Sequence, residues 1–302
     1  MLNKKRQSLI EKGAAILFIC CALISIIAVL TITAYMVISG TPALKEVGVM
    51  DILFGTVWSP SATDPKFGIL YIILTSLLGT IFAVILGVPI GVLSAVYLSE
   101  IASTRFRKIL KSVVELLAGI PSIIYGLLGI MIICPIVYQL ELIVFKNTIN
   151  HQYTGGANFI SAILVLTLMI LPTLINMTET ALKAVPMHYR TSSLALGATK
   201  MQTIFKVVIP SAKTGIMSAV ILGIGRAIGE TMAILCVAGN AINLPYPFNS
   251  VRFLTTAIAT EMAYSEGLHR LVLFTIGLVL FIFIMFVNIV LSYILKKGAK
   301  YE

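Results

Sequence analysis

Six apolar stretches, each long enough to cross a lipid bilayer, constrain the fold of this chain more than any other feature. A membrane-spanning helix needs about 20 predominantly apolar residues, and only 11% of the 302 residues are charged. The sequence therefore predicts an all-α membrane protein with one transmembrane domain, residues 13–295, between terminal segments 1–12 and 296–302. The six predicted spans lie near residues 14–38, 68–98, 113–138, 158–182, 215–238 and 269–295.

The positions of the basic residues predict the orientation in the membrane. Most lysines and arginines lie before the first span, in segments 99–111 and 183–214, and after the last span. Loops on the cytoplasmic side are enriched in these residues, so both termini are predicted to be cytoplasmic. This topology accounts for most of the net charge of +10, and we expect no binding of nucleic acid. The cysteines show no metal-site spacing.

A long polar segment, residues 183–214, separates the fourth and fifth spans and is predicted to fold on the cytoplasmic side. Gly197 suits the left-handed backbone position that ends a helix over residues 187–196. Thr199 and Gln202 have the spacing of a capping box, which predicts the start of a second helix. The segment is therefore expected to form a helix–glycine–helix element.

The second helix of this element is predicted to be amphipathic. Met201, Ile204, Phe205 and Val208 have the spacing that places them on one helix face, and Pro210 is expected to end the helix. Such a helix could lie on a surface of anionic lipid. It could equally dock its apolar face into a groove of a soluble partner.

The fifth span contains two charged residues, Arg226 and Glu230, which a membrane helix tolerates only at a cost. Their separation of four residues predicts that they share a helix face. They could form a structural ion pair, or Arg226 could attract an anion in a transport pathway while Glu230 orients the guanidinium. Ser122 and Tyr125 lie beside a proline in the third span and are candidates for lining such a pathway.

The cytoplasmic segment resembles the loop shared by permease subunits of bacterial ATP-binding-cassette (ABC) importers. The family pattern is Glu-Ala-Ala, three residues, Gly, nine residues, and Ile-x-Leu-Pro. Here Gly197 and Pro210 stand at the expected distance, and aliphatic Val207 and Ile209 precede the proline. The triplet departs from the pattern, because Thr191 stands where the family usually has an acid. An ionic contact through that acid is therefore not expected here.

Residues 226–231 resemble the permeases of phosphate importers, and residues 232–240 and 115–126 resemble the C-type subunit of these importers. The resemblance spans about residues 70–295 and implies a type I importer permease fold with cytoplasmic coupling helices. The implied partners are a homologous sister permease, two ATP-binding subunits and an extracytoplasmic phosphate-binding protein. The implied pathway residues are Arg226, Glu230, Ser122 and Tyr125. The residues implied to contact the ATPase are Gly197, Met201, Ile204, Phe205, Val208 and Pro210.

The sequence argues against an enzyme. It contains no Gly-x4-Gly-Lys-Ser/Thr motif for ATP and no recognisable catalytic constellation, and no cofactor is predicted. Two other transport functions remain open. One is a permease of the same architecture for another oxyanion, such as molybdate or sulfate. The other is an ion-coupled secondary transporter or channel, which predicts midplane carboxylates, whereas Glu230 is the only acid expected deep in the membrane.

Overall fold

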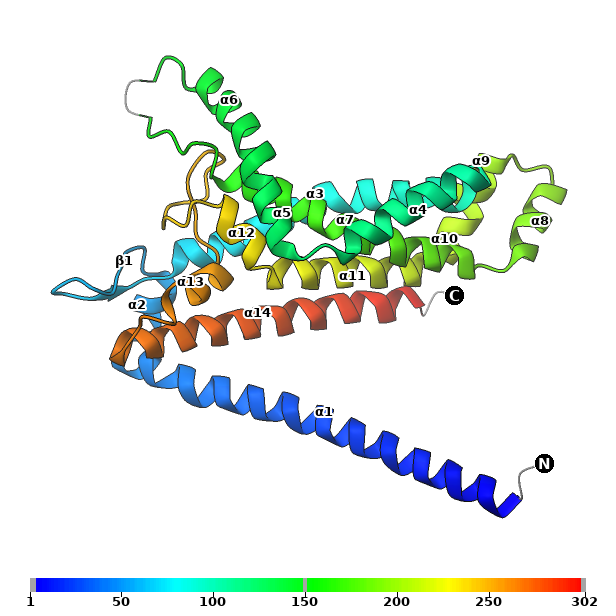
Figure 1. Cartoon of the computed structure of the whole chain (residues 1–302), viewed down its shortest axis with the longest axis horizontal. Coiled ribbons are helices and arrows are strands. Elements are labelled where there is room, and N and C mark those ends of the chain that lie inside the picture. Colours follow the sequence, from blue (N-terminus) through cyan, green and yellow to red (C-terminus); the bar gives the residue numbers. More distant parts are fainter. Residues whose placement is uncertain (1–3, 149–150, 300–302) are drawn as a thin grey trace.

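Long helices run along the length of the molecule in the computed structural model, which describes residues 4–148 and 151–299 (Figure 1). The predicted segments 1–12 and 296–302 lie partly outside the described residues. Among the described residues, five helices are long and apolar enough to cross a membrane, and the number is six when a pair bent by 68°, Lys200–Ser211 and Lys213–Gly229, is counted as one span. This confirms the predicted helical membrane fold. The five are Glu11–Glu46, Leu70–Ile101, Ser122–Val144, Phe159–Ala184 and Gly267–Val290.

The first helix, α1 (Lys4–Glu46), is longer than predicted and extends into the expected outer loop. Its C-terminal part packs on α14 (Gly267–Ala299), whereas its N-terminal part diverges from the bundle (Figure 1). Pro42 lies inside α1, and the Thr275 hydroxyl donates to the Gly40 carbonyl at 2.7 Å. Packing against α14 therefore supports the helix beyond the point where the sequence suggested a loop.

The outer loop that follows α1 contains a short helix, α2 (Val49–Phe54), and a small antiparallel hairpin. The hairpin consists of β1 (Trp58–Ser59) and β2 (Lys66–Phe67), with Trp58 opposite Phe67. Phe67 is buried in a cluster with Ile52 and residues of α14. The hairpin thus closes the outer end of the first and last helices.

Helices α3 (Leu70–Val96) and α7 (Phe159–Ala184) form the centre of the bundle. Two glycines of α3 allow the close approach: a Cβ on Gly87 would lie 2.7 Å from the Ile170 side chain, and one on Gly91 would lie 2.8 Å from that of Leu174. Small residues at contacts between membrane helices allow dense van der Waals packing. Helix α3 continues into a π-helical turn, η1 (Tyr97–Ile101).

The third span does not cover residues 113–138 as predicted. An amphipathic helix, α4 (Thr104–Gly119), ends before Pro121, and the spanning segment begins only at Ser122. Ile120 has an extended backbone, because a residue before proline is disfavoured in helical conformation. The spanning segment consists of α5 (Ser122–Leu128), the π-helical turn η2 (Gly129–Ile133) and α6 (Cys134–Val144).

The fifth span is also interrupted, since α11 (Lys213–Gly229) ends inside the predicted span 215–238. A separate short helix, α12 (Met232–Val237), follows it. The segment between the predicted spans 215–238 and 269–295 contains α13 (Leu254–Glu261), whose first residues are buried. The Thr255 hydroxyl donates to the Glu230 carbonyl at 2.7 Å, so this outer segment fixes the break between α11 and α12.

Candidate transport pathway and coupling surface

The helix–glycine–helix element folds around Gly197 as predicted. Helix α8 (Met187–Ala195) ends just before this glycine, whose φ of 87° lies in the left-handed region. Helix α9 (Lys200–Thr203) then starts with the predicted capping box, in which Thr199 and Gln202 exchange hydrogen bonds. The helix–glycine–helix geometry is therefore confirmed.

The four residues predicted to share one apolar helix face, Met201, Ile204, Phe205 and Val208, are divided between two sides of the element. A π-helical turn, η3 (Ile204–Val208), follows α9. Ile204 and Val208 are 1% and 0% exposed and pack in a core cluster, whereas Met201 and Phe205 are 51% and 49% exposed. The prediction that all four form one docking surface is wrong, because a π turn changes the register that regular helical spacing assumes.

Pro210 does not end the helix as predicted. Helix α10 (Ile209–Ser211), which contains this proline, continues directly from η3, so the helical segment extends over Lys200–Ser211 and ends one residue after the proline. The chain bends by 68° between Ser211 and Lys213 before α11 begins. The coupling element therefore leads directly into the fifth span through this bend.

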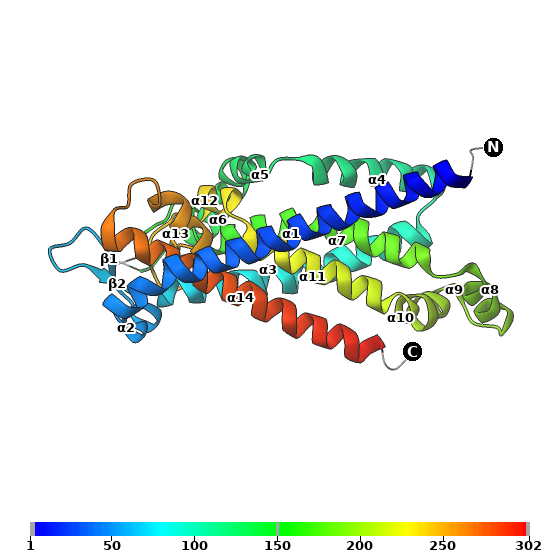
Figure 2. The same ribbon diagram turned by 90° about the horizontal axis from the view of Figure 1, so that it is seen from below.

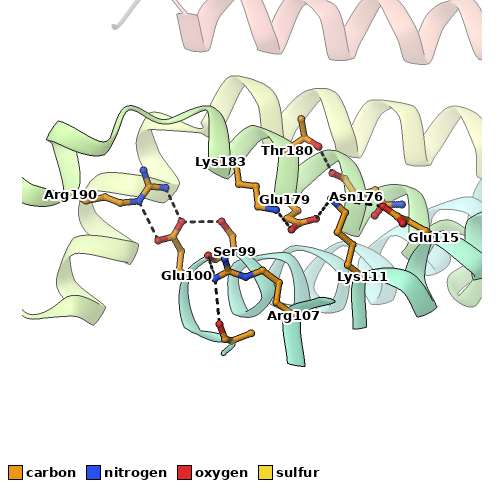
Figure 3. Close-up of polar contacts among 11 residues, drawn as sticks. Ser99, Glu100, Arg107, Lys111, Glu115, Asn176, Glu179, Thr180, Lys183 and Arg190 are labelled. Carbon is orange, nitrogen blue, oxygen red and sulfur yellow. Dashed lines mark hydrogen bonds and ion pairs between the residues drawn. The ribbon is translucent and has the colours of Figure 1, made fainter. Parts of the chain in front are cut away.

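An ion pair that the sequence did not suggest ties the coupling element to η1. The Arg190 guanidinium donates to Glu100 at 2.8 Å and also to the carbonyls of Leu182 and Val185 (Figure 3). Both charged side chains are largely buried. Arg190 thus fixes α8 to the C-terminal ends of α3 and α7, a long-range contact of which local sequence spacing gives no signal.

Arg226 and Glu230 do not share a helix face, contrary to the prediction. The helix ends at Gly229, and Glu230 has an extended backbone. The Glu230 carboxylate accepts the Ala233 N–H at 2.9 Å, which caps the start of α12. Arg226 instead donates to the Thr173 hydroxyl on α7 at 2.9 Å. No ion pair joins Arg226 to a carboxylate within residues 4–148 and 151–299.

Tyr125 is only 8% exposed. Its hydroxyl donates to the Leu117 carbonyl at 2.8 Å, so it joins α4 to α5 across the break at Pro121. Tyr125 also lines a cavity of about 330 Å³ between these helices and α7, whose other lining residues are apolar. Such a lining does not suit a phosphate ion. Ser122, at the start of α5, is partly exposed and does not line this cavity.

Two acids besides Glu230 are buried within the protein, each near the end of its helix. These are Glu179 on α7 and Glu141 on α6. Glu179 pairs with Lys183 and with Lys111 of α4 (Figure 3), and Glu141 accepts hydrogen bonds from His151 and Thr154. Each of the two buried acids thus has partners of its own, and neither is left free to bind a coupling ion.

Comparison with known proteins identifies the family. Residues 87–299 match the family model described as the inner membrane component of binding-protein-dependent transport systems. The chain belongs to this family. A probable ABC transporter permease of Bacillus subtilis, YqgH, is 35% identical over 95% of this chain and 92% of its own length. The phosphate transport permease PstC of Haemophilus influenzae is 31% identical over 93% of each chain.

A solved structure supports the fold assignment. A chain of the inward-facing MetNI methionine ABC transporter superposes with a TM-score of 0.55 at 21% identity, over 76% of this chain and 94% of that one. The protein is therefore an ABC importer permease of the cell membrane with several spans, and it is not itself an enzyme. Such a permease works with ATP-binding and substrate-binding components. Secondary transport by this chain alone is thereby excluded.

Proposed function

We propose that this permease forms part of the pathway for inorganic phosphate, with Arg226 supplying the positive charge that attracts the anion. The supporting observation is the environment of Arg226, whose guanidinium is partly exposed and bonded to a neutral hydroxyl. A charge within a membrane span is costly unless it meets an opposite charge. An anion in the pathway would supply that charge, and the PstC relatives transport phosphate.

The second candidate function is transport of another oxyanion, such as sulfate or molybdate. Arg226 would attract any of these anions, and the name of the B. subtilis relative specifies no substrate. Selectivity for phosphate over sulfate would have to come from groups that accept a hydrogen bond from the protonated oxygen of phosphate, because sulfate carries no proton at neutral pH. A competition experiment between these anions therefore distinguishes the two candidate functions, whereas the charge of Arg226 does not.

The proposed assembly contains a homologous sister permease, two ATP-binding subunits and an extracytoplasmic phosphate-binding protein. Both termini are placed in the cytoplasm. The distribution of basic residues supports this orientation, and so does the position of the coupling element. The start of α1, the end of α14 and helices α8 and α9 all lie toward the same end of the molecule (Figure 2).

The exposed side of the coupling element is the proposed contact with the ATPase. It presents Met201 and Phe205, together with Leu196, which is 90% exposed. From residue 181 to residue 229 the sequence contains no acid, so we expect an apolar groove with an acidic rim on the ATPase. Closing of the ATPase subunits on ATP would shift the permease between inward-facing and outward-facing arrangements.

Uptake by the reconstituted complex tests this proposal. Proteoliposomes with the sister permease, the ATPase and the binding protein should accumulate radiolabelled phosphate when ATP is present. Excess unlabelled phosphate should suppress accumulation, whereas excess sulfate or molybdate should not. Arg226→Lys should retain partial uptake because the charge remains, whereas Arg226→Gln should lose it. If sulfate or molybdate suppresses the accumulation of labelled phosphate, transport of another oxyanion would be the better assignment.

A further inference from the structure

One face of α7 is polar from the middle of the helix to its cytoplasmic end. Thr173, Asn176, Thr180 and Lys183 follow one another at intervals of three or four residues, so they lie on the same side of the helix. All four are partly or fully exposed, whereas most residues on the side that packs on α3 are buried. A helix in a membrane rarely keeps such a polar face without a function.

The depth of this face shows that it does not contact lipid tails. Helix α7 has 26 residues, which gives a length of about 39 Å, compared with about 30 Å for the hydrocarbon core of a bilayer. Asn176 lies about 12 Å before the cytoplasmic end at Ala184. A polar side chain at that depth is costly in hydrocarbon, so the face must contact water or protein.

Cations lie at both ends of the polar face. At its deep end the Arg226 guanidinium bonds to Thr173. At its cytoplasmic end Lys183 and Lys111 both approach Glu179 and are 43% and 42% exposed, whereas the Glu179 side chain is only 3% exposed (Figure 3). The other carboxylate here, Glu115, lies 3.8 Å from Lys111. The exposed groups at this end are thus two lysines and one acid.

Between these ends the face offers hydrogen-bond donors without charge. The Thr180 hydroxyl donates to the Asn176 carbonyl at 2.8 Å. The Asn176 side chain makes no hydrogen bond with the part of the chain that the structure describes, so its amide N–H groups are free to bind a ligand. Neutral donors between Arg226 and the two exposed lysines, which are paired with Glu179 and Glu115, suit an anion that must bind and also leave, because strong binding along the way would trap it.

We propose that this polar face of α7 is the route by which the anion passes from Arg226 to the cytoplasm. Asn176 donates hydrogen bonds to the anion on the way, and Lys111 and Lys183 attract it to the exit. The route rests on the proposed function in one respect, since it begins at the anion site of Arg226. It would serve phosphate or another oxyanion equally.

Accessibility of single cysteines tests whether the face contacts water. Asn176→Cys and Thr180→Cys are introduced into a permease whose native cysteines are replaced and whose uptake is intact. The complete complex, in inside-out vesicles, is treated with a membrane-impermeant anionic methanethiosulfonate. We expect labelling at least about tenfold faster than at Ile85→Cys, a control on α3 that is 58% exposed on an apolar surface. Inorganic phosphate should slow labelling at Asn176→Cys.

A charge at Asn176 tests whether the anion passes there. Asn176→Asp places a carboxylate within about 6 Å of the route, and at an effective dielectric of about 20 this repulsion corresponds to more than a tenfold effect. We expect uptake to fall at least about tenfold, while the complex assembles in normal yield and hydrolyses ATP. Asn176→Gln, which keeps the amide donors, should retain most of the uptake.

The outcomes of these experiments test the proposed route separately from the identity of the transported anion. Labelling no faster than at Ile85→Cys would overturn the route and indicate that the sister permease covers this face. Full uptake by Asn176→Asp would overturn it too, even if the cysteines react. In both cases phosphate uptake by the wild-type complex would leave the proposed function intact. If the wild type carries sulfate or molybdate instead, and Asn176→Asp blocks that anion, the route stands and only the phosphate assignment fails.

Discussion

Phe205 and Ile204 are neighbours in the coupling element, but their environments are opposite, so alanine should act differently at the two positions. Phe205 is 49% exposed, whereas Ile204 is 1% exposed and packs in the core cluster. Phe205→Ala should therefore change the stability of the permease by less than about 0.5 kcal/mol. It removes an aromatic anchor that is worth about 2 kcal/mol in an interface, which corresponds to roughly thirtyfold weaker ATPase binding.

Ile204→Ala is the matched control. It removes buried methyl and methylene groups and leaves a cavity, which should destabilise the fold by about 2–5 kcal/mol. Thermal unfolding of the purified permease measures the change in stability, and titration of the ATPase onto the permease in nanodiscs measures the change in ATPase affinity. Phe205→Ala should keep the wild-type melting temperature and lose affinity, whereas Ile204→Ala should melt at a lower temperature.

Two results would refute this reasoning. If Phe205→Ala binds the ATPase with unchanged affinity, the exposed side of η3 is not the docking surface. If Phe205→Ala and Ile204→Ala lower the melting temperature equally, the division of the element into a buried side and an exposed side is wrong. In the second case the regular helical register, with a single apolar ridge, would be the better description.

Three further predictions concern Gly197, Glu230 and Arg226. Gly197→Val should abolish uptake, whereas Gly197→Asn should not. The φ of Gly197 is 87° and no atom lies within 4 Å of an added Cβ, so the two variants differ only in the strain of the left-handed backbone. Equal uptake rates for the two variants would contradict this. Glu230→Ala should lower stability by about 1 kcal/mol through loss of the cap. Glu230→Gln should unfold like the wild type, because its amide oxygen still accepts the Ala233 N–H, and an equal loss of stability in both variants would contradict this. Arg226→Glu should assemble but show no uptake, because it places a negative charge where the anion is expected, and normal uptake would refute the role of Arg226.

Short-range rules predicted the coupling turn well. The capping box at Thr199 and the left-handed Gly197 depend on residues within one or two helical turns, and both are present. The burial of Ile204 and Val208 and the exposure of Met201 and Phe205 were not predicted, because the π turn shifts residues after Thr203 relative to regular helical spacing. Pro210 was a visible signal, but it was interpreted as a helix end instead of as part of an irregular turn.

The breaks in the third and fifth spans illustrate what hydropathy cannot predict. An apolar window does not distinguish a continuous helix from two helices joined by an extended residue. The break at Ile120 had a local cause in Pro121, which the sequence contains. The break at Glu230 is stabilised by a hydrogen bond from Thr255, far away in the chain. The supposed pairing of Arg226 with Glu230 failed for the same reason, since it assumed an unbroken helix.

The coupling surface and Arg226 belong to one continuous stretch of chain, and this links the two halves of the proposed mechanism. Ile204 and Val208 pack with residues in the C-terminal parts of α3 and α7, while α10 leads through one bend into α11. A force applied at Phe205 therefore acts on three helix ends together. Helix α11 carries Arg226 about 20 Å from this bend, where it bonds to Thr173 of α7. A relative movement of α11 and α7 would change that bond, and with it the position of the positive charge that the anion meets.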